Sequence, residues 1–329
     1  MKTRDYIVFL IFFLVALNGM LVSQVSAQSV LISWQAVTQD TSGNPESTPI
    51  YYNIYCETFP FFTPDTSNFL AATTDTSYVH TDSRLSDPNI HLYYIVTAVD
   101  VWGNESALSE RVGEVDFVGA KVKIFLQGAY NAAGDTMTTS LALSGDLPLS
   151  SPYSEAPRTV SSIPSGVTDW ILVQLRRQPD SSVVSSQSFF LKSNGMIVEP
   201  DGSTQDIGLP NVTDDSYYLV LKHRNHLSAM SRDALALTKN ATTLYDFTAG
   251  SDKFYGTGGA KELENGVWGM FGGNANNEND MINVTDYSVV KSQFAQSGYL
   301  QGDVNLSGVV SIPDYSITKS NFAKYSTVP

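Results

Sequence analysis

Short stretches in which hydrophobic and polar residues alternate recur along the chain between residues 29 and 270. In the first part they cover residues 30–34, 51–56, 77–80 and 91–99, separated by turn-forming residues. Such alternation is the period of a half-buried β-strand, and strands this short and closely spaced are typical of antiparallel sandwiches. We therefore expect a β-sandwich over residues 28–117.

A second group of hydrophobic stretches covers residues 121–127, 169–175, 188–192 and 217–223 and is rich in β-branched and aromatic residues. Loops rich in Pro, Gly and Asp separate them, and Asn194-Gly195 between two apolar stretches indicates a tight hairpin. No long helical period interrupts this region. We expect a second antiparallel β-sandwich over residues 118–268, so that the fold is mostly β, with two tandem sandwiches.

Particular residues of the first region resemble a fibronectin type III domain. These are Trp34 in an early strand, the run Tyr93–Asp100, Leu85 eight residues before that run, and the turn Gly103–Ser106. The resemblance implies a spacer or binding domain without catalytic residues. The second region is similar to a module found between other domains of exported Bacteroidetes-type proteins, and that likeness implies no activity.

The amino-terminal residues 1–27 have the features of a secretory signal peptide. Lys2 and Arg4 precede an apolar run, and Val25-Ser26-Ala27 provides small residues for cleavage. The alternative is a membrane anchor, because apolar residues continue to Val22, but no stop-transfer charges follow. We expect an exported protein, secreted or at the cell surface, with no membrane span after cleavage.

The net charge of the chain, −14 at pH 7, bears on its partners. An acidic surface repels polyanions, so nucleic acid and anionic membranes are not expected as partners. It is compatible with an extracellular setting that is rich in cations.

The sequence repeats itself near its carboxyl end. Residues 286–295 (DYSVVKSQFA) and 314–323 (DYSITKSNFA) are identical at seven of ten positions, with an offset of 28 residues. Such a duplication marks a small structural unit that is used twice. Ser311 and Asp314 form a capping-box pattern, and Tyr315, Thr318 and Phe322 follow at helical spacing, so we expect a helix after residue 311 with these three residues on an apolar face.

Oxygen-bearing residues precede the second copy at the spacing of a twelve-residue calcium loop. With Asp303 as position 1, Gly308 falls at position 6, where the loop turns sharply. Asp replaces the usual Glu at position 12, and no amphipathic helix precedes the loop. The predicted ligands of this loop, called loop 2, are Asp303, Asn305, Ser307, the carbonyl of Val309, Ser311 and Asp314.

The segment before the first copy, called loop 1, follows the same pattern less closely. It has one residue too many and lacks the glycine of the turn. Its predicted ligands are Asn274, Asn276, Glu278 or Asp280, Asn283 and Asp286. We expect one Ca²⁺ ion in loop 2, and a second ion in loop 1 is the open alternative to a polar turn.

Two calcium loops, each followed by a helix that starts near Asp-Tyr, resemble the dockerin type I module, here over residues 269–329. The resemblance implies folding that depends on calcium and docking onto a cohesin domain. Lys291-Ser292 and Lys319-Ser320 stand where the family often has Ser-Thr pairs for partner recognition. We expect an extracellular protein partner, cohesin-like or a second copy of this chain.

No catalytic motif for nucleophilic, zinc or phosphate chemistry occurs, so we expect no enzymatic activity and no catalytic residues. His223 and His226 are three apart in a predicted strand, which places them on opposite faces, away from a shared ion. The carboxylates Asp169, Asp214, Asp215 and Glu262 show no pairing pattern of a glycosidase.

The most direct function is extracellular binding or assembly by a non-catalytic modular protein. A second hypothesis is an accessory component of polysaccharide degradation that binds glycan through exposed aromatic residues. The candidate residues are Tyr153, Trp170, Trp268 and Phe271. A third hypothesis is a structural subunit of an extracellular matrix or filament.

Overall fold

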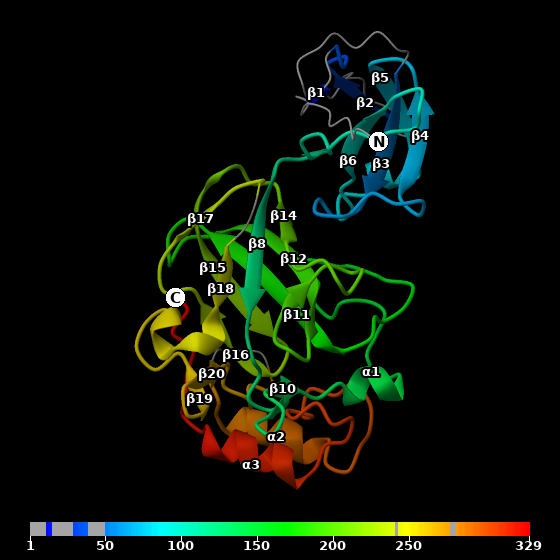
Figure 1. Cartoon of the computed structure of the whole chain (residues 1–329). Helices are drawn as coiled ribbons and strands as arrows, with labels where there is room; N and C mark the ends of the chain where they lie inside the picture. Colours follow the sequence, from blue (N-terminus) through cyan, green and yellow to red (C-terminus); the bar gives the residue numbers. More distant parts are fainter. Residues whose placement is uncertain (1–10, 15–28, 39–49, 241–242, 277–280) are drawn as a thin grey trace, which may run out of the picture. The chain divides into compact units, whose positions relative to one another are not determined.

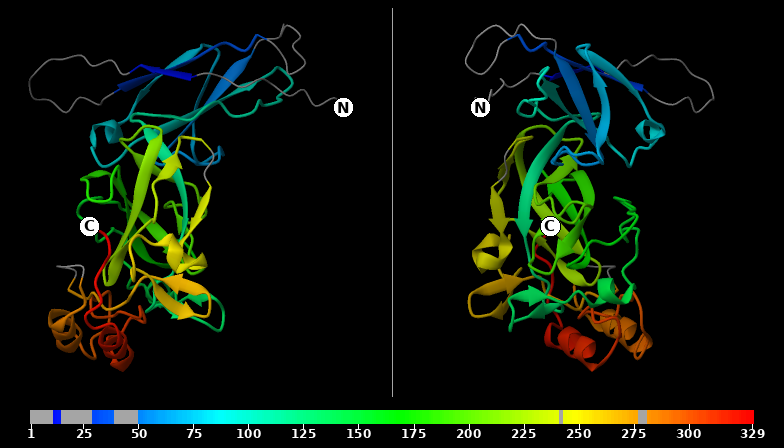
Figure 2. Two further views of the ribbon diagram at one scale, coloured as in Figure 1. Left: turned by 90° about the vertical axis from the view of Figure 1, so that its left-hand side faces the viewer. Right: turned by 45° about the vertical axis from the view of Figure 1, so that its right-hand side comes forward.

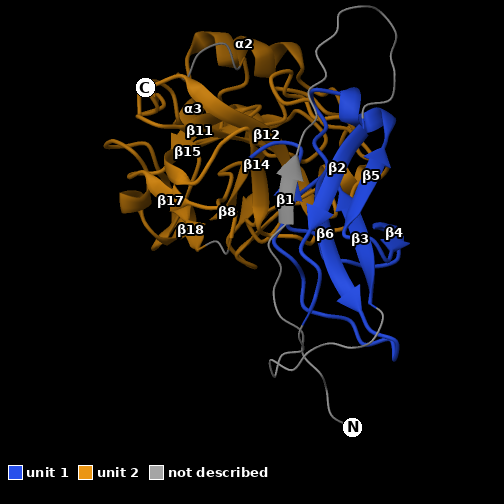
Figure 3. Ribbon diagram, turned by 90° about the horizontal axis from the view of Figure 1, so that it is seen from above, with its two compact units in different colours: residues 1–116 blue, residues 117–329 orange. Residues whose placement is uncertain are grey.

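The chain folds into two compact units, residues 1–116 and 117–329 (Figures 1 and 3). The computed structural model describes residues 11–14, 29–38, 50–240, 243–276 and 281–329. Strands dominate both units, and the α-helices of the described residues are α1 (Ser140–Ser144), α2 (Val284–Ser292) and α3 (Ile312–Ser320). The mostly β fold with a small helical part near the carboxyl end is confirmed.

Unit 1 is a sandwich of a three-stranded and a four-stranded sheet. The first has the order β1 (Ile11–Leu14), β2 (Ser29–Trp34), β5 (Ser77–Thr81). The second has the order β4 (Phe69–Thr73), β3 (Tyr51–Glu57), β6 (Tyr93–Val99), β7 (Val112–Gly113), and a short 3₁₀ helix, η1 (Ser83–Ser86), precedes β6. Strand β1 lies inside the predicted signal peptide and pairs with β2. Cleavage of the signal peptide, which stays a prediction, would remove this strand.

The core of unit 1 contains the residues that suggested a fibronectin type III domain, with one change. Trp34 and Leu85 are buried in one cluster, and the Trp34 ring lies 5.3 Å from that of Tyr52. Tyr94, not Tyr93, joins this cluster, where its hydroxyl lies 2.9 Å from Nδ1 of His80. The arrangement supports a fibronectin-like sandwich.

Unit 2 also contains two facing sheets. The larger has the order β13 (Ile197–Val198), β12 (Val183–Lys192), β11 (Val167–Arg176), β15 (Asp215–His223), β16 (His226–Met230), with β17 (Leu235–Leu237) also paired to β15. The smaller has the order β14 (Ile207–Pro210), β8 (Phe117–Lys123), β18 (Leu244–Asp246). Two small hairpins, β9 (Tyr130–Asn131) with β10 (Thr136–Met137) and β19 (Lys261–Glu264) with β20 (Val267–Gly269), and the 3₁₀ helices η2 (Phe247–Ala249) and η3 (Ser251–Lys253) complete the unit.

Strand β11 lies at the centre of the larger sheet, and most of its residues are apolar and buried on both faces. Nine of its ten residues are buried, and Trp170 stacks 4.1 Å from Phe190 of β12. The hairpin predicted at Asn194-Gly195 joins β12 and β13, with Gly195 at φ +85°. A positive φ is the conformation for which such turns favour glycine.

Helices α2 and α3 lie side by side at the end of the second sandwich (Figures 1 and 2). Each begins with a capping box, Asn283 with Asp286 and Ser311 with Asp314. The expected apolar face of α3 is only partly buried, since Thr318 is inside but Tyr315 and Phe322 are exposed. In the part of the chain that is described, no helix is long and apolar enough to span a membrane.

The sandwich predicted for residues 118–268 and the helical module predicted for residues 269–329 lie in one compact unit. Leu306 of loop 2 is fully buried in the core of the sandwich. The backbone of Gly128 lies so close to loop 2 that a Cβ there would be 1.9 Å from the carbonyl oxygen of Val304. The module also has a small core of its own, formed by Ala275, Val290, Val304 and Val310.

Candidate metal centre

Loop 2 closes around the carboxylate of Asp303, which is fully buried. Its Oδ1 accepts the N–H of Ser307 at 3.0 Å, and its Oδ2 accepts the N–H of Gly308 at 2.8 Å. Gly308 has φ +89°, a conformation that residues with a side chain rarely adopt. The glycine predicted from the spacing is therefore the residue that lets the chain turn over this carboxylate.

Asp314 brings the other end of loop 2 to the same place. Its Oδ1 accepts the N–H of Asn305 at 2.9 Å, and its Oδ2 accepts the N–H of Ser311 at 2.8 Å. Burial raises the pKa of Asp303, and the charge of Asp314 raises it further. Two buried carboxylates that repel each other are stabilised by a cation placed between them.

Loop 1 repeats this hydrogen-bond pattern at the equivalent residues. Oδ1 of Asp286 accepts the N–H of Asn276 at 3.0 Å, and Oδ2 accepts the N–H of Asn283 at 2.8 Å. Oδ1 of Asn274 is buried and has no hydrogen-bond partner in the structure. Glu278 and Asp280, the alternative middle ligands, lie outside the described residues.

The donor atoms of the two loops suit a hard cation that prefers oxygen. The described residues contain no group of three or more His, Cys, Asp or Glu that could hold a metal ion. The loops instead combine Asp303, Asp314 and Asp286 with amide, hydroxyl and carbonyl oxygens, as calcium sites do. A bound Ca²⁺ would neutralise these carboxylates. It would also pair with the buried Oδ1 of Asn274, which has no hydrogen-bond partner otherwise.

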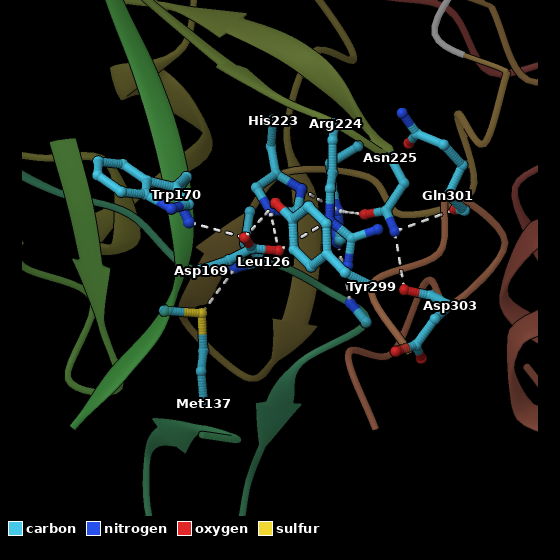
Figure 4. A network of polar contacts seen from close by, with 12 residues as sticks. Leu126, Met137, Asp169, Trp170, His223, Arg224, Asn225, Tyr299, Gln301 and Asp303 are labelled. Atoms are coloured by element: carbon cyan, nitrogen blue, oxygen red, sulfur yellow. Dashed lines mark hydrogen bonds and ion pairs between the residues drawn. The ribbon is translucent and has the colours of Figure 1, made fainter. Parts of the chain in front are cut away.

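The sequence did not predict the polar residues that support the loops. The expectation that His223 and His226 lie on opposite faces of one strand was wrong. His223 and His226 are paired across a two-residue turn between β15 and β16, so that their Nδ1 atoms lie 3.1 Å apart. The four consecutive polar residues His223–His226 between two apolar stretches could have indicated a hairpin. Both histidines are buried and hydrogen-bonded, as Figure 4 shows for His223.

The hydrogen bonds assign a tautomer to each histidine. Nε2 of His226 accepts the N–H of Gly128 at 3.2 Å, so the proton of His226 is on Nδ1. Nε2 of His223 lies 3.2 Å from Oδ2 of Asp169 and donates to it, which leaves Nδ1 of His223 as an acceptor. Burial lowers the pKa of both rings, well below the ordinary value for His226. Both are therefore neutral at pH 7.

Asp169 of β11 and Arg224 of the β15–β16 turn form a buried ion pair beside the segment that precedes loop 2 (Figure 4). Nε of Arg224 lies 2.9 Å from Oδ2 of Asp169, and the Tyr299 hydroxyl donates to Oδ1 at 2.7 Å. The guanidinium lies 4.1 Å from the centre of the Tyr299 ring and also donates to the carbonyl of Leu300. The positive charge of Arg224 lowers the pKa of Asp169 against the effect of burial. The segment before loop 2 is thus held to the sandwich by this ion pair.

Several of the candidates for other chemistry have structural roles. Asp169 is fully buried in its ion pair, and Asp215 pairs with Arg177 at the surface. Tyr153, Trp170 and Phe271 are buried in the core, and Trp268 is half-buried, so these four residues do not form an exposed platform for sugars.

No protein-family model and no curated protein matches this chain. Solved structures do match, among them two type II cohesin–X–dockerin complexes from Acetivibrio cellulolyticus. The mutant of the N-terminal interface is 14% identical, covers 64% of this chain and 98% of its own, and has a TM-score of 0.33. The mutant of the C-terminal interface has the same identity and coverage with a TM-score of 0.34.

The chicken CNTN1 FN1–FN3 domains also match, at 10% identity over 74% of this chain and 65% of that chain, with a TM-score of 0.19. TM-scores this low do not establish a shared fold.

Proposed function

We propose that this chain is an exported, non-catalytic modular protein that serves in extracellular binding or assembly. Its helical module binds Ca²⁺ in loop 2, through Asp303, Asn305, Ser307, Val309, Ser311 and Asp314, and in loop 1, through Asn274, Asn276, Asn283 and Asp286. The ion holds each loop closed and so fixes the helix that follows it. The module then docks onto a protein partner.

The matching geometry of the two loops carries this proposal. In each loop one buried aspartate closes the turn by accepting two backbone N–H groups at nearly the same distances, 3.0 and 2.8 Å for Asp286 and 2.9 and 2.8 Å for Asp314. Without an ion, the burial of Asp303 beside Asp314 and of the unpaired Oδ1 of Asn274 would cost free energy. These features are expected where a cation completes the site.

The repeat also places apolar residues on the surface of the module. Val284 and Ile312 occupy the first position of α2 and α3 and are 67% and 69% exposed. Tyr287 and Tyr315 contact each other edge to face with ring centres 5.0 Å apart, and Tyr315 remains exposed. Exposed apolar residues on a fixed pair of helices are suited to bind another protein, and their exposure supports docking here.

Calorimetric titration of the full mature chain with Ca²⁺ tests the metal function. We expect two binding events for the wild type and one for Asp314→Ala, which loses the residue that closes loop 2. Asp286→Ala should likewise lose only the loop 1 event. Absence of heat and of any spectral change at millimolar Ca²⁺ would overturn the proposal.

Sedimentation analysis with and without Ca²⁺ tests the docking function and separates the partners. Calcium-dependent dimers or longer assemblies would identify a second copy of this chain as the partner. A calcium-loaded monomer that binds a cohesin domain in a pull-down would identify a separate partner. Ile312→Asp should abolish either association, whereas Leu143→Asp, at an 84% exposed site of α1, should not. Association that ignores both calcium and Ile312→Asp would contradict docking through the helices.

A further inference from the structure

Asn225, in the β15–β16 turn, contacts the start of both loops, and Figure 4 shows its contacts with Gln301 and Asp303 before and in loop 2. Its main-chain oxygen accepts the N–H of Gly273 at 3.0 Å and that of Asn274 at 3.1 Å, where loop 1 begins. Its side-chain Nδ2 donates to the main-chain oxygen of Asp303 at 2.8 Å and to that of Gln301 at 3.2 Å, where loop 2 begins. One fully buried residue of the sandwich thus touches the first proposed ligand residue of each loop.

His226 fixes the direction of the Asn225 amide. Because Nε2 of His226 accepts the N–H of Gly128, its Nδ1 carries the proton and donates to Oδ1 of Asn225 at 2.9 Å. The Oδ1 end of the amide is therefore held by the sandwich, and the Nδ2 end is directed at loop 2. Asn225 has no freedom to turn without losing three side-chain hydrogen bonds at once.

We propose that Asn225 is a positioning residue for calcium, which aligns Asp303 and Asn274 for the ion and links metal binding to the fold of the sandwich. This inference rests on the proposed binding of calcium by the two loops. Residues that orient metal ligands without touching the metal commonly change affinity by about 10-fold to 100-fold when they are removed. No part of the calcium-loop sequence pattern includes position 225.

The two loops depend on Asn225 in different ways, and this gives the proposal a specific signature. Loop 2 is held by the side chain of Asn225, whereas loop 1 is held by its main-chain oxygen, which every residue type has. Truncation of the side chain should therefore weaken loop 2 and leave loop 1 nearly unchanged. General loss of stability would affect both loops alike.

Calcium titration of the full chain tests this signature. Asn225→Ala is combined with Asp286→Ala, which leaves loop 2 to be measured, and with Asp314→Ala, which leaves loop 1. We expect the Ca²⁺ affinity of loop 2 to fall by about tenfold or more, and that of loop 1 to change by less than about threefold, because its hydrogen bonds remain. Should the alanine variants not fold, Asn225→Ser, whose hydroxyl is too short to reach the loop 2 carbonyls, replaces Asn225→Ala in the same comparison.

Ser188→Ala is the matched control, because Ser188 is equally buried and donates to the main-chain oxygen of Ala156 at 2.6 Å, away from both loops. It should lower the melting temperature and leave both calcium affinities unchanged. Unchanged affinity of loop 2 in Asn225→Ala, an equal loss in both loops, or the same loss in Ser188→Ala would overturn the role of Asn225. A wild type that binds no calcium would instead overturn the proposed function itself.

Discussion

Asp169 joins the sandwich to the helical module through several hydrogen bonds. Its carboxylate accepts hydrogen bonds from His223, Arg224 and Tyr299, which come from a strand, a turn and the segment before loop 2. Arg224 is close enough to loop 2 to lower the pKa of Asp303. Asp169 therefore neutralises a buried positive charge that would otherwise oppose the binding of a cation beside it.

Asp169→Asn should lower the free energy of unfolding of unit 2 by about 3–5 kcal/mol, because it leaves the buried charge of Arg224 without a counter-ion. Urea unfolding of the full chain measures this loss. Asp215→Asn is the control, since its pair with Arg177 is at the surface and should contribute less than about 1 kcal/mol. An equal loss of unfolding free energy in the two variants would show that the buried ion pair contributes no more to stability than the surface pair.

The buried histidines should make unit 2 less stable in acid. Burial lowers the pKa of His223, so below the ordinary value of about 6.5 the unfolded chain binds a proton that the folded chain does not. The free energy of unfolding must then fall as the pH falls below 6.5.

His223→Gln retains a donor toward Asp169 and removes the titration. Between pH 7 and pH 5 the wild type should lose up to about 2 kcal/mol more than this variant, at about 1.4 kcal/mol per pH unit below 6.5. Comparison of the two proteins cancels the other titrating groups, among them Glu199, whose pKa burial raises to about 7. Parallel pH profiles would contradict a neutral His223.

At the scale of elements, loop 2 is held between its own helix and the turn at Gly128. Leu306 of the loop is buried in the sandwich core, and the backbone of Gly128 packs directly against the backbone of the loop at Val304. The chain can come this close only where no Cβ intervenes, so glycine at this position is required by the packing of the loop and not by its own backbone conformation.

Gly128→Ala should therefore displace loop 2 and weaken its calcium site. The added methyl group would overlap the carbonyl of Val304 and should lower the free energy of unfolding of unit 2 by about 1–3 kcal/mol, as overpacking does. Gly134→Ala is the control, because its Cβ would meet only the Thr136 hydroxyl, at 3.2 Å. Thermal melts with and without Ca²⁺ would measure both effects, and equal behaviour of the two variants would argue against close packing of loop 2.

The sequence was sufficient where the determining pattern is local. The hairpin at Asn194-Gly195, the capping box of Ser311 and Asp314, and the turn at Gly308 were predicted because neighbouring residues determine them. The pairing of His223 with His226 depends on a reversal of the chain that alternation alone does not reveal. The contacts of Asn225 and Gly128 with loop 2 join segments far apart in the sequence, which no spacing rule connects.

At the scale of the whole molecule, the calcium loops are part of a larger folding unit. Loop 2 shares its core with the sandwich through Leu306, and residues after α3 return along the sandwich, where the Ser326 hydroxyl donates to the carbonyl of Ser228 at 2.9 Å. A module of about 60 residues buries little core by itself. Its integration explains how two short helices with polar sequences remain folded.

Calcium should accordingly stabilise the whole of residues 117–329 and not only the helices. An ion that binds only the folded state at 100 times its Kd adds about 2.7 kcal/mol per site, so two sites should raise the melting temperature of this unit by about 10–20 °C. Differential scanning calorimetry of the full chain should show two transitions, of which the one for unit 1 is indifferent to EDTA. The Asp303→Ala and Asp286→Ala double variant should abolish the calcium shift. A third transition, small and sensitive to calcium, would mean that the helices melt apart from the sandwich, and the contacts of Asn225 and Leu306 would then be too weak to join them.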